Sequence, residues 1–166
     1  MFQKTQDYWN SRPFTHGFLL GLVIFFGTYI PITNLWAPEL IQIVGQSMFP
    51  ALENGNRAVF VTKFEEIRRG DIVSFLSPKR EAYYCKRVIG LPGDEIIISG
   101  NAMVINGQIN HEYYVALFSD ERTRIINVPL NHYFVMGDNR PYSEDSRYFG
   151  CIPRSDINSK LFCKVW

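Results

Sequence analysis

Three segments spread along the chain carry the side chains that could do chemistry. They read GQSMFP at residues 45–50, YYCKRVIGLPGD at residues 83–94 and MGDNRPYSEDSRYFG at residues 136–150. The first offers Ser47 and the second Lys86. A serine hydroxyl becomes a nucleophile when an adjacent base takes its proton, and a lysine is such a base only while its amine is neutral. Taken singly, each segment is more typical of a loop, a solvated strand or a turn, so the interpretation rests on their joint presence.

Together the three segments resemble the motifs of the bacterial type I signal (leader) peptidases, a family of membrane-anchored serine proteases. The similarity extends over residues 17–154. It implies Ser47 as nucleophile and Lys86 as general base. It also implies that Ser143 orients the lysine amine and that Asp145 and Arg147 form a supporting ion pair. The matching positions are Ser47, Met48, Pro50, Lys86, Arg87, Gly90, Pro92, Gly93, Asp94, Gly137, Asp138, Asn139, Ser143, Asp145, Ser146 and Arg147.

One position departs from the family pattern. Many members have Ser or Thr two residues before the nucleophile, where the hydroxyl can join the nucleophile's backbone N–H in an oxyanion hole. Here that position is Gly45. Because the loss of an oxyanion donor can cost about 10²-fold or more in rate, the second donor is left unassigned and the Ser47 N–H is expected to be the main one.

The strand expected around Lys86 must bury the amine if the lysine is to act as a base. A lysine of ordinary pKa is almost wholly charged at neutral pH, and burial in apolar surroundings lowers that pKa. On a strand, Tyr84, Lys86 and Val88 face one side and Arg87 faces the other. The opposite orientation, with Lys86 in solvent and Arg87 buried, fits the alternation equally well. The pairing with Ser47 favours the first.

The third segment offers groups that can support a neutral lysine. The Ser143 hydroxyl can hydrogen-bond the amine without adding charge. A carboxylate in contact with Lys86 would raise the pKa of the amine, so Asp145 is expected to pair with Arg147 instead. The Asp-Asn dipeptide at 138–139 is interpreted as a turn former.

Other kinds of site have less support. His111 and His132 could serve a Ser-His-Asp triad, but packed or capping roles are the more ordinary interpretation. The chain has no His-Glu-x-x-His and its cysteines, Cys85, Cys151 and Cys163, are scattered, so no metal and no cofactor are expected. Three cysteines allow at most one internal disulfide, with Cys151–Cys163 as one candidate.

Length and charge limit what the chain can be. Its 166 residues leave room for one globular domain. The 17 Lys and Arg residues are balanced by 16 Asp and Glu residues, for a net charge of +1. The basic surface expected of a nucleic-acid binder is therefore missing, and no nucleic-acid partner is expected.

An apolar segment near the N-terminus predicts a membrane anchor. No Asp, Glu, Lys or Arg occurs from Pro13 to Pro38, and residues 17–32 read GFLLGLVIFFGTYIPI. About 17 to 25 mostly apolar residues suffice to cross a bilayer. A buried core helix would keep a polar face, and a cleaved signal peptide would need small residues that TNLWAPEL does not provide. We therefore expect residues 1–38 to form a cytoplasmic N-terminus and a single transmembrane helix. The N-terminus is placed in the cytoplasm because Lys4 and Arg12 precede the segment. The family resemblance implies that the membrane is a bacterial inner (plasma) membrane.

Residues 39–166 then form an exported catalytic domain, and their pattern predicts mainly β structure. Short β-branched and aromatic runs alternate with turn residues, which is typical of all-β domains. The family resemblance implies that these strands form an antiparallel sandwich or barrel-like fold of the signal peptidase type. Asn106-Gly107 predicts a two-residue hairpin turn, and 53–55 and 92–94 predict further turns. No long amphipathic helix is expected after residue 40. The predicted strands are 57–61, 71–75, 95–99, 124–128, 132–136 and 160–166.

Three functions follow, in order of preference. The first is a signal peptidase I, a hydrolase that removes signal peptides from exported preproteins after small residues at the first and third positions before the bond. The substrate would lie extended beside a sheet edge. The second is a pilin-maturation peptidase of conjugative transfer with the same Ser/Lys chemistry. The third is an inactive, membrane-anchored β-domain that serves as an adaptor.

Overall fold

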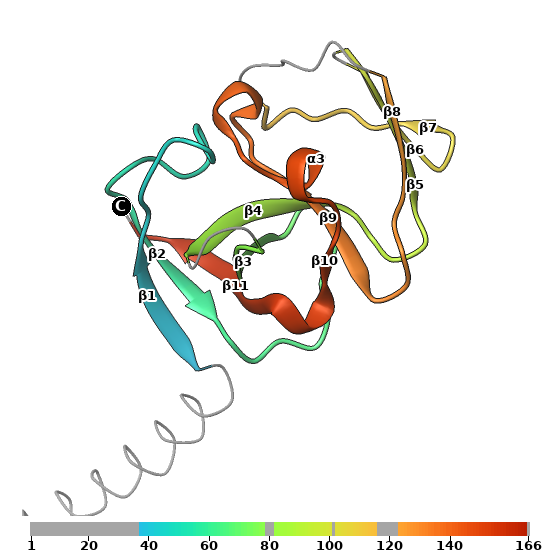
Figure 1. Ribbon diagram of the computed structural model, residues 1–166. Helices are drawn as coiled ribbons and strands as arrows, with labels where there is room; N and C mark the ends of the chain where they lie inside the picture. Colours follow the sequence, from blue (N-terminus) through green and yellow to red (C-terminus); the bar gives the residue numbers. More distant parts are fainter. Residues whose placement is uncertain (1–36, 79–81, 101, 116–122, 166) are drawn as a thin grey trace, which may run out of the picture. The chain divides into compact units, whose positions relative to one another are not determined.

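The regular secondary structure in the described part of the chain is almost wholly antiparallel β-strand, as the sequence predicts (Figure 1). From Pro38 onward it forms one compact unit. The predicted anchor at 17–32 lies outside the described residues, and within those residues no helix is long and apolar enough to cross a membrane. The computed structural model describes residues 37–78, 82–100, 102–115 and 123–165.

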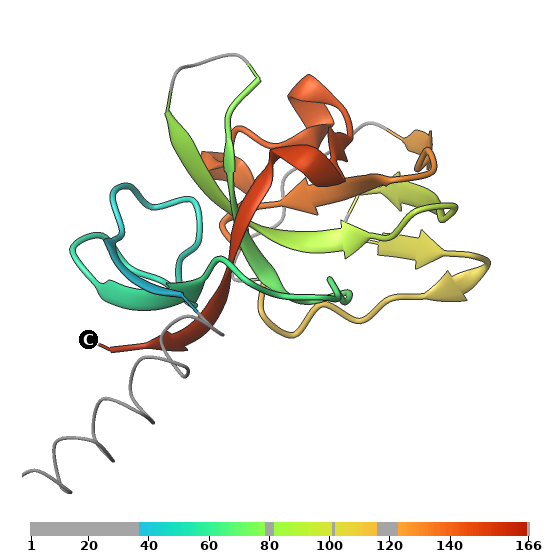
Figure 2. The ribbon, with the colours of Figure 1, turned by 90° about the horizontal axis from the view of Figure 1, so that it is seen from below.

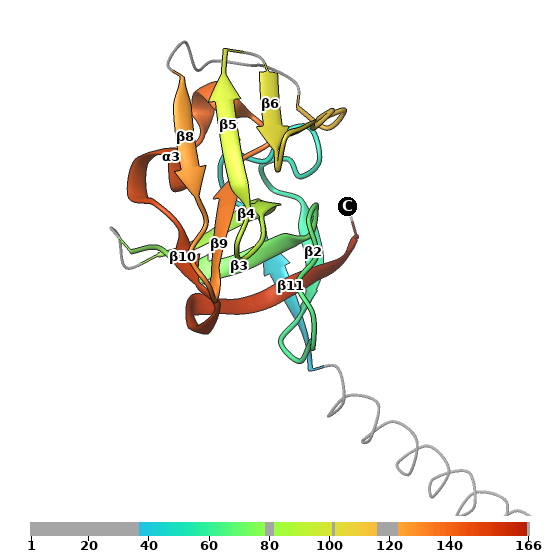
Figure 3. The ribbon, with the colours of Figure 1, turned by 90° about the vertical axis from the view of Figure 1, so that its right-hand side faces the viewer.

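Two sheets make up the domain. The larger has seven strands in the order β1-β2-β11-β3-β4-β9-β10, and the smaller has four in the order β7-β6-β5-β8. The chain leaves the larger sheet after β4 and returns to it at β9, so the smaller sheet is a single excursion (Figures 2 and 3). The strands are β1 (Pro38–Gln42), β2 (Arg57–Val61), β3 (Ile72–Leu76), β4 (Tyr83–Gly90), β5 (Glu95–Ser99), β6 (Ala102–Ile105), β7 (Gln108–Ile109), β8 (Arg124–Asn127), β9 (His132–Met136), β10 (Ile152–Pro153) and β11 (Ile157–Lys164).

The local signals in the sequence match the observed strands closely. The bounds predicted for β2, β5 and β9 are confirmed, and those for β3 and β8 differ by one residue at one or both ends. Along β5, Ile96 and Ile98 are buried in the core while Ile97 between them is half-buried, as alternation requires. The hairpin turn between β6 and β7 is also confirmed, since Asn106 and Gly107 have φ of 52° and 77°.

Among the strands and the α-helix, β1, β10 and α3 were not anticipated, and β11 begins earlier than predicted. β1 begins at Pro38, at the predicted end of the anchor, and forms one edge of the larger sheet by pairing with β2. β11 begins at Ile157, three residues before the predicted strand, and carries a bulge in each of its two pairings. α3 (Ser146–Phe149) is a single helical turn within the third motif, so the absence of a long helix holds for the described residues.

Three apolar clusters hold these layers together. One lies between the smaller sheet and β9, and includes Ile96 and Phe134. A second surrounds Val73 and Val88 in the middle of the larger sheet. The third lies under the segment that carries Ser47 and consists of Ile43, Met48, Leu52, Ala58, Phe60 and Ile72.

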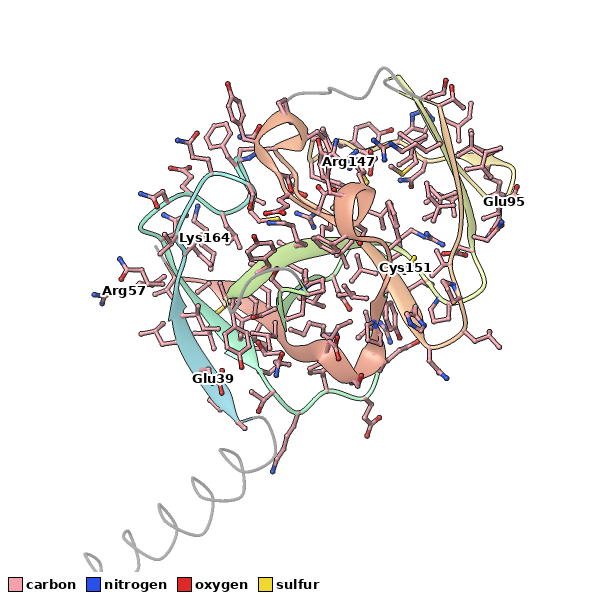
Figure 4. All side chains as sticks on the ribbon, in the orientation of Figure 1. Glu39, Arg57, Glu95, Arg147, Cys151 and Lys164 are labelled. Carbon is pink, nitrogen blue, oxygen red and sulfur yellow. The ribbon has the colours of Figure 1, made fainter. Side chains whose placement is uncertain are left out.

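The candidate disulfide between Cys151 and Cys163 is wrong, because all three cysteines are free. Cys151 directly precedes β10 at one edge of the larger sheet, whereas Cys163 lies on β11, four places away in the strand order. At about 4.8 Å per strand the two are far beyond the roughly 6 Å Cα separation of a disulfide. Figure 4 shows the same separation between Cys151 and Lys164, the residue after Cys163.

Candidate active site

Ser47 lies in the loop between β1 and β2, on a turn that is held by a backbone hydrogen bond and by a buried side chain. The Phe49 N–H donates to the Gln46 carbonyl at 3.1 Å, and the side chain of Met48 is buried in the third apolar cluster. Gly45 has a φ of +98°, and its N–H donates to Asn54 Oδ1 at 2.9 Å. Because that φ favours glycine, the departure from Ser or Thr at this position has a local cause in the backbone.

Lys86 reaches Ser47 from β4. Its Nζ lies 2.7 Å from Ser47 Oγ, its side chain is buried with 4% exposure, and the amine lies 5.1 Å from the centre of the Tyr84 ring. The orientation that the pairing with Ser47 favoured is therefore observed. Burial lowers the pKa of the Lys86 amine, and nearby charges, that of Asp145 first among them, oppose the shift. When the amine is neutral, the same contact lets the serine hydroxyl donate its proton to nitrogen.

The turn expected at 138–139 is observed, since the Tyr142 N–H donates to the Asn139 carbonyl at 3.1 Å, but Asp138 and Asn139 also make contacts that the sequence did not indicate. Asp138 is fully buried and forms a two-point ion pair with Arg87, with N–O distances of 2.8 and 2.6 Å. Burial raises the pKa of the Asp138 carboxyl, although Arg87 acts in the opposite direction. Asn139 holds the nucleophile loop at two successive carbonyls: its N–H donates to Ser47 O at 3.0 Å and its Nδ2 to Gln46 O at 3.1 Å.

Gly137 is where the nucleophile loop meets Ser143. A Cβ atom at this position would lie 2.3 Å from Ser143 Oγ and 2.5 Å from the Ser47 carbonyl oxygen, so only glycine fits. The Ser143 hydroxyl is buried, and among the described residues it has no hydrogen-bond partner. Its predicted role in orienting Lys86 stays a prediction.

The expected pairing of Asp145 with Arg147 is observed. Arg147 Nε and Nη2 lie 2.9 and 3.0 Å from the two carboxylate oxygens, and both side chains are almost fully buried. Asp145 also accepts the Gly137 N–H at 3.0 Å and caps the first turn of α3. Arg147 is itself a residue of α3 (Figure 4). The carboxylate thus accepts from the Gly137 amide and the Arg147 guanidinium.

A cavity of 1040 Å³ opens in front of Ser47 and Lys86. One wall is β1 with the residues that follow it, and another is the start of β4, where Tyr84 donates from its hydroxyl to Glu144 at 2.8 Å. Cys85 also lines the cavity, and burial raises the pKa of its thiol to about 12, so it remains protonated. The site therefore combines a serine, a buried amine and a long cleft beside an edge strand.

A family model described as signal peptidase, peptidase S26, matches residues 15–166. The chain belongs to this family. Signal peptidase I of Leptolyngbya laminosa is 35% identical over 140 residues, which are 77% of this chain and 68% of that protein. Signal peptidase I P of Bacillus subtilis subsp. natto is 37% identical over 154 residues, which are 84% of this chain and 80% of that protein.

The crystal structure of a signal peptidase I from Enterococcus faecalis V583 has the same fold. It is 32% identical to this chain, with a TM-score of 0.55, and the match covers 60% of this chain and all of that one. Membership of the signal peptidase family confirms the expected serine-type endopeptidase. It also agrees with the resemblance on which the sequence analysis rested.

The two histidines considered for a catalytic triad contact other residues. His111 stacks on Tyr113 with ring centres 6.0 Å apart, and His132 Nδ1 lies 2.9 Å from the Leu130 carbonyl. The base that contacts Ser47 is Lys86. In the part of the chain that the structure describes, no cluster of three or more His, Cys, Asp or Glu side chains could hold a metal ion.

Proposed function

We propose that this signal peptidase removes N-terminal signal peptides from exported preproteins, with Ser47 as nucleophile and Lys86 as general base. The 2.7 Å contact between Ser47 Oγ and the amine of a buried lysine carries the proposal. A serine without a base is a poor nucleophile, and a lysine in water is too fully protonated to be one. Burial lowers the pKa of Lys86 and so favours the neutral amine that a general base requires.

The reaction follows from this contact. Ser47 Oγ attacks the carbonyl carbon of the scissile bond while its proton passes to Lys86 Nζ. The tetrahedral intermediate collapses when the C–N bond breaks and the ammonium returns that proton to the leaving amine, which leaves an acyl ester on Ser47. A water molecule then attacks the ester with Lys86 again as base, and the proton returns to Ser47 Oγ. The Ser47 N–H is the proposed oxyanion donor.

The cleft suits an extended peptide. β1 is an edge strand, and its exposed residues line the cavity together with the start of β4. A peptide that adds a strand at such an edge gains main-chain hydrogen bonds, while pockets between the strands select alternate side chains. Small residues at the first and third positions before the bond would point toward this wall.

The membrane arrangement is part of the same proposal. Residues 17–32 would anchor the chain in the bilayer, with the N-terminus in the cytoplasm and the catalytic domain on the outer face. Preproteins delivered through the membrane would then meet the cleft as they emerge. A dedicated prepilin substrate is the alternative within this chemistry. Mass spectrometry of a candidate pilin would distinguish simple trimming from cyclisation, since cyclisation removes one further water.

The decisive experiment uses Ser47→Ala and Lys86→Met in the full-length protein in detergent with a preprotein substrate. Both variants should lose cleavage altogether. Ser155→Ala and Lys160→Met make the same chemical changes outside the cavity and should keep it. Cleavage by Lys86→Met would refute the Ser/Lys dyad. An adaptor without catalytic activity would show no cleavage by the parent protein and would keep its cellular role in both site variants.

A further inference from the structure

We propose that Glu112 is a positioning residue, which acts through Arg140 to hold Gly137 in contact with the nucleophile loop. Glu112 lies outside all three motifs, in the segment 112–114 that follows β7. The inference rests on the proposed roles of Ser47 and Lys86. It adds a remote segment of the chain to the machinery of that site.

Glu112 and Arg140 form a buried ion pair. Arg140 Nη2 lies 2.7 Å from Glu112 Oε1, and the two side chains are 4% and 2% exposed. The Tyr114 hydroxyl donates to the same oxygen at 3.0 Å. Burial, followed by the charge of Glu112, raises the pKa of Tyr114, so this phenol remains a neutral donor. Arg140 is thus held at its guanidinium by Glu112, and the Glu112 carboxylate is held in turn by Tyr114.

The pair leads directly to Gly137. Arg140 Nε donates to the Gly137 carbonyl at 2.9 Å, while the Gly137 N–H donates to Asp145. The backbone of this glycine is therefore fixed on both sides, at its N–H by Asp145 and at its C=O by Arg140. Because Gly137 packs against the Ser47 carbonyl with no room for a Cβ atom, a shift of its backbone would be passed on to the nucleophile loop.

The same segment also contacts the strand that carries Lys86. The guanidinium carbon of Arg87 lies 4.3 Å from the centre of the Tyr114 ring, and Arg87 is the neighbour of Lys86 on β4. Segment 112–114 is therefore connected to both parts of the site. Glu112 reaches Gly137 through Arg140, and Tyr114 contacts Arg87, the neighbour of Lys86.

Stability alone gives a poor account of this pair. Replacing a buried ion pair by apolar side chains of similar volume is often neutral or stabilising. The second carboxylate oxygen of Glu112 is buried and has no hydrogen-bond partner among the residues that the structure describes. An arrangement that leaves a charged oxygen without a donor is costly, and a positional requirement at Gly137 accounts for it.

Two variants of the full-length protein test the proposal by peptide cleavage under conditions in which each is folded. Glu112→Gln keeps the shape of the side chain but removes its charge. Its kcat should fall about 10- to 100-fold with KM within about twofold, because a displacement of the reacting groups slows chemistry more than binding. Glu66→Gln, which removes a carboxylate from an exposed ion pair, is the matched control and should keep the parent kcat.

The double variant Glu112→Met, Arg140→Met separates positioning from folding. It should unfold at a urea concentration equal to or above that of Glu112→Gln and still have a low kcat, since the Gly137 carbonyl has lost its donor. Recovery of the parent kcat in the double variant would overturn the proposal, and so would a parent-like kcat in Glu112→Gln or failure of both variants to fold. Cleavage by Ser47→Ala or Lys86→Met in the same assay would instead refute the proposed function.

Discussion

Replacing Gly137 by alanine tests whether the close approach of Ser47 and Ser143 at this residue is needed for catalysis. The added Cβ would lie 2.3 Å from Ser143 Oγ, 2.5 Å from Ser47 O and 2.6 Å from Ser143 Cβ. The serine hydroxyl can rotate away, but the Ser47 carbonyl belongs to the backbone of the nucleophile loop. That loop is fixed by Asn139 and by the buried Met48 side chain, so the new methyl group has to displace it.

The size of the effect follows from these distances. Restoring ordinary van der Waals contact requires a shift of about 1 Å at Ser47, and a misplacement of that size can cost about 10²-fold in rate. Overpacking of this kind typically destabilises a protein by about 1 to 3 kcal/mol. We therefore expect kcat to fall about 100-fold while the protein remains folded at room temperature, with a modest loss in the free energy of unfolding.

Gly90→Ala is a matched control within the same chain. Its Cβ would lie 2.5 Å from Ile96 Cδ1 and 2.9 Å from Val128 Cγ2, so it is also too close to its neighbours, but these are side-chain methyl groups of the cluster between the smaller sheet and β9. Both variants should lose stability in urea unfolding, Gly137→Ala the more, and only Gly137→Ala should lose kcat against a preprotein-derived peptide. Equal kcat values for the two would refute the reasoning, because the effect would then come from stability alone.

Four further predictions concern Lys86, Asp138 and the cysteines. Because burial lowers the pKa of Lys86, the unfolded chain binds more protons than the folded one between that pKa and the ordinary lysine value. Stability should therefore rise with pH across this range and Lys86→Met should be more stable than the parent at neutral pH, as urea titrations would show. The cleavage rate should fall as pH drops below the lowered pKa, and a flat acid limb would contradict a lysine base. Asp138→Asn should lower the free energy of unfolding in urea by about 3 kcal/mol or more, because it leaves the Arg87 guanidinium without its buried carboxylate. A loss as small as that of Glu66→Gln, which breaks an exposed ion pair, would contradict the assigned pair. Iodoacetamide should modify exposed Cys163 first and leave Cys85 largely unmodified, because burial raises the pKa of the Cys85 thiol to about 12. Mass spectrometry would measure the modification of each cysteine, and faster labelling of Cys85 would contradict its placement.

Local pattern was a good guide to the strands and turns. The alternation in β5 and the Asn106-Gly107 turn each depend on residues within a few positions of one another, so their sequence is enough to predict them. β1 and α3 could not be found in this way. β1 adjoins a long apolar segment whose pattern conceals its start, and α3 is a single turn that begins at a cap formed by Asp145.

In the site, too, some contacts could be predicted from the sequence and others could not. The family resemblance implied the Asp145–Arg147 pair, and the need to keep a carboxylate away from Lys86 favoured it. The contacts of Asp138 with Arg87 and of Asn139 with the nucleophile loop join segments that lie far apart, and their residue types alone indicated only a turn. Glu112 had no signal at all, since one glutamate in a polar stretch is most often a solvated residue.

The sequence by itself determined the chemistry available to this protein: one serine, one lysine and a motif rich in small and charged residues, in an order that identifies the family. It also determined most strands, because side-chain alternation is a local property. Only the tertiary structure decided that Lys86 is buried against Ser47 rather than solvated, since the alternation allowed both orientations. Burial depends on which segments pack over a side chain, and here the nucleophile loop contacts the amine through Ser47 while the Tyr84 ring lies 5.1 Å from it.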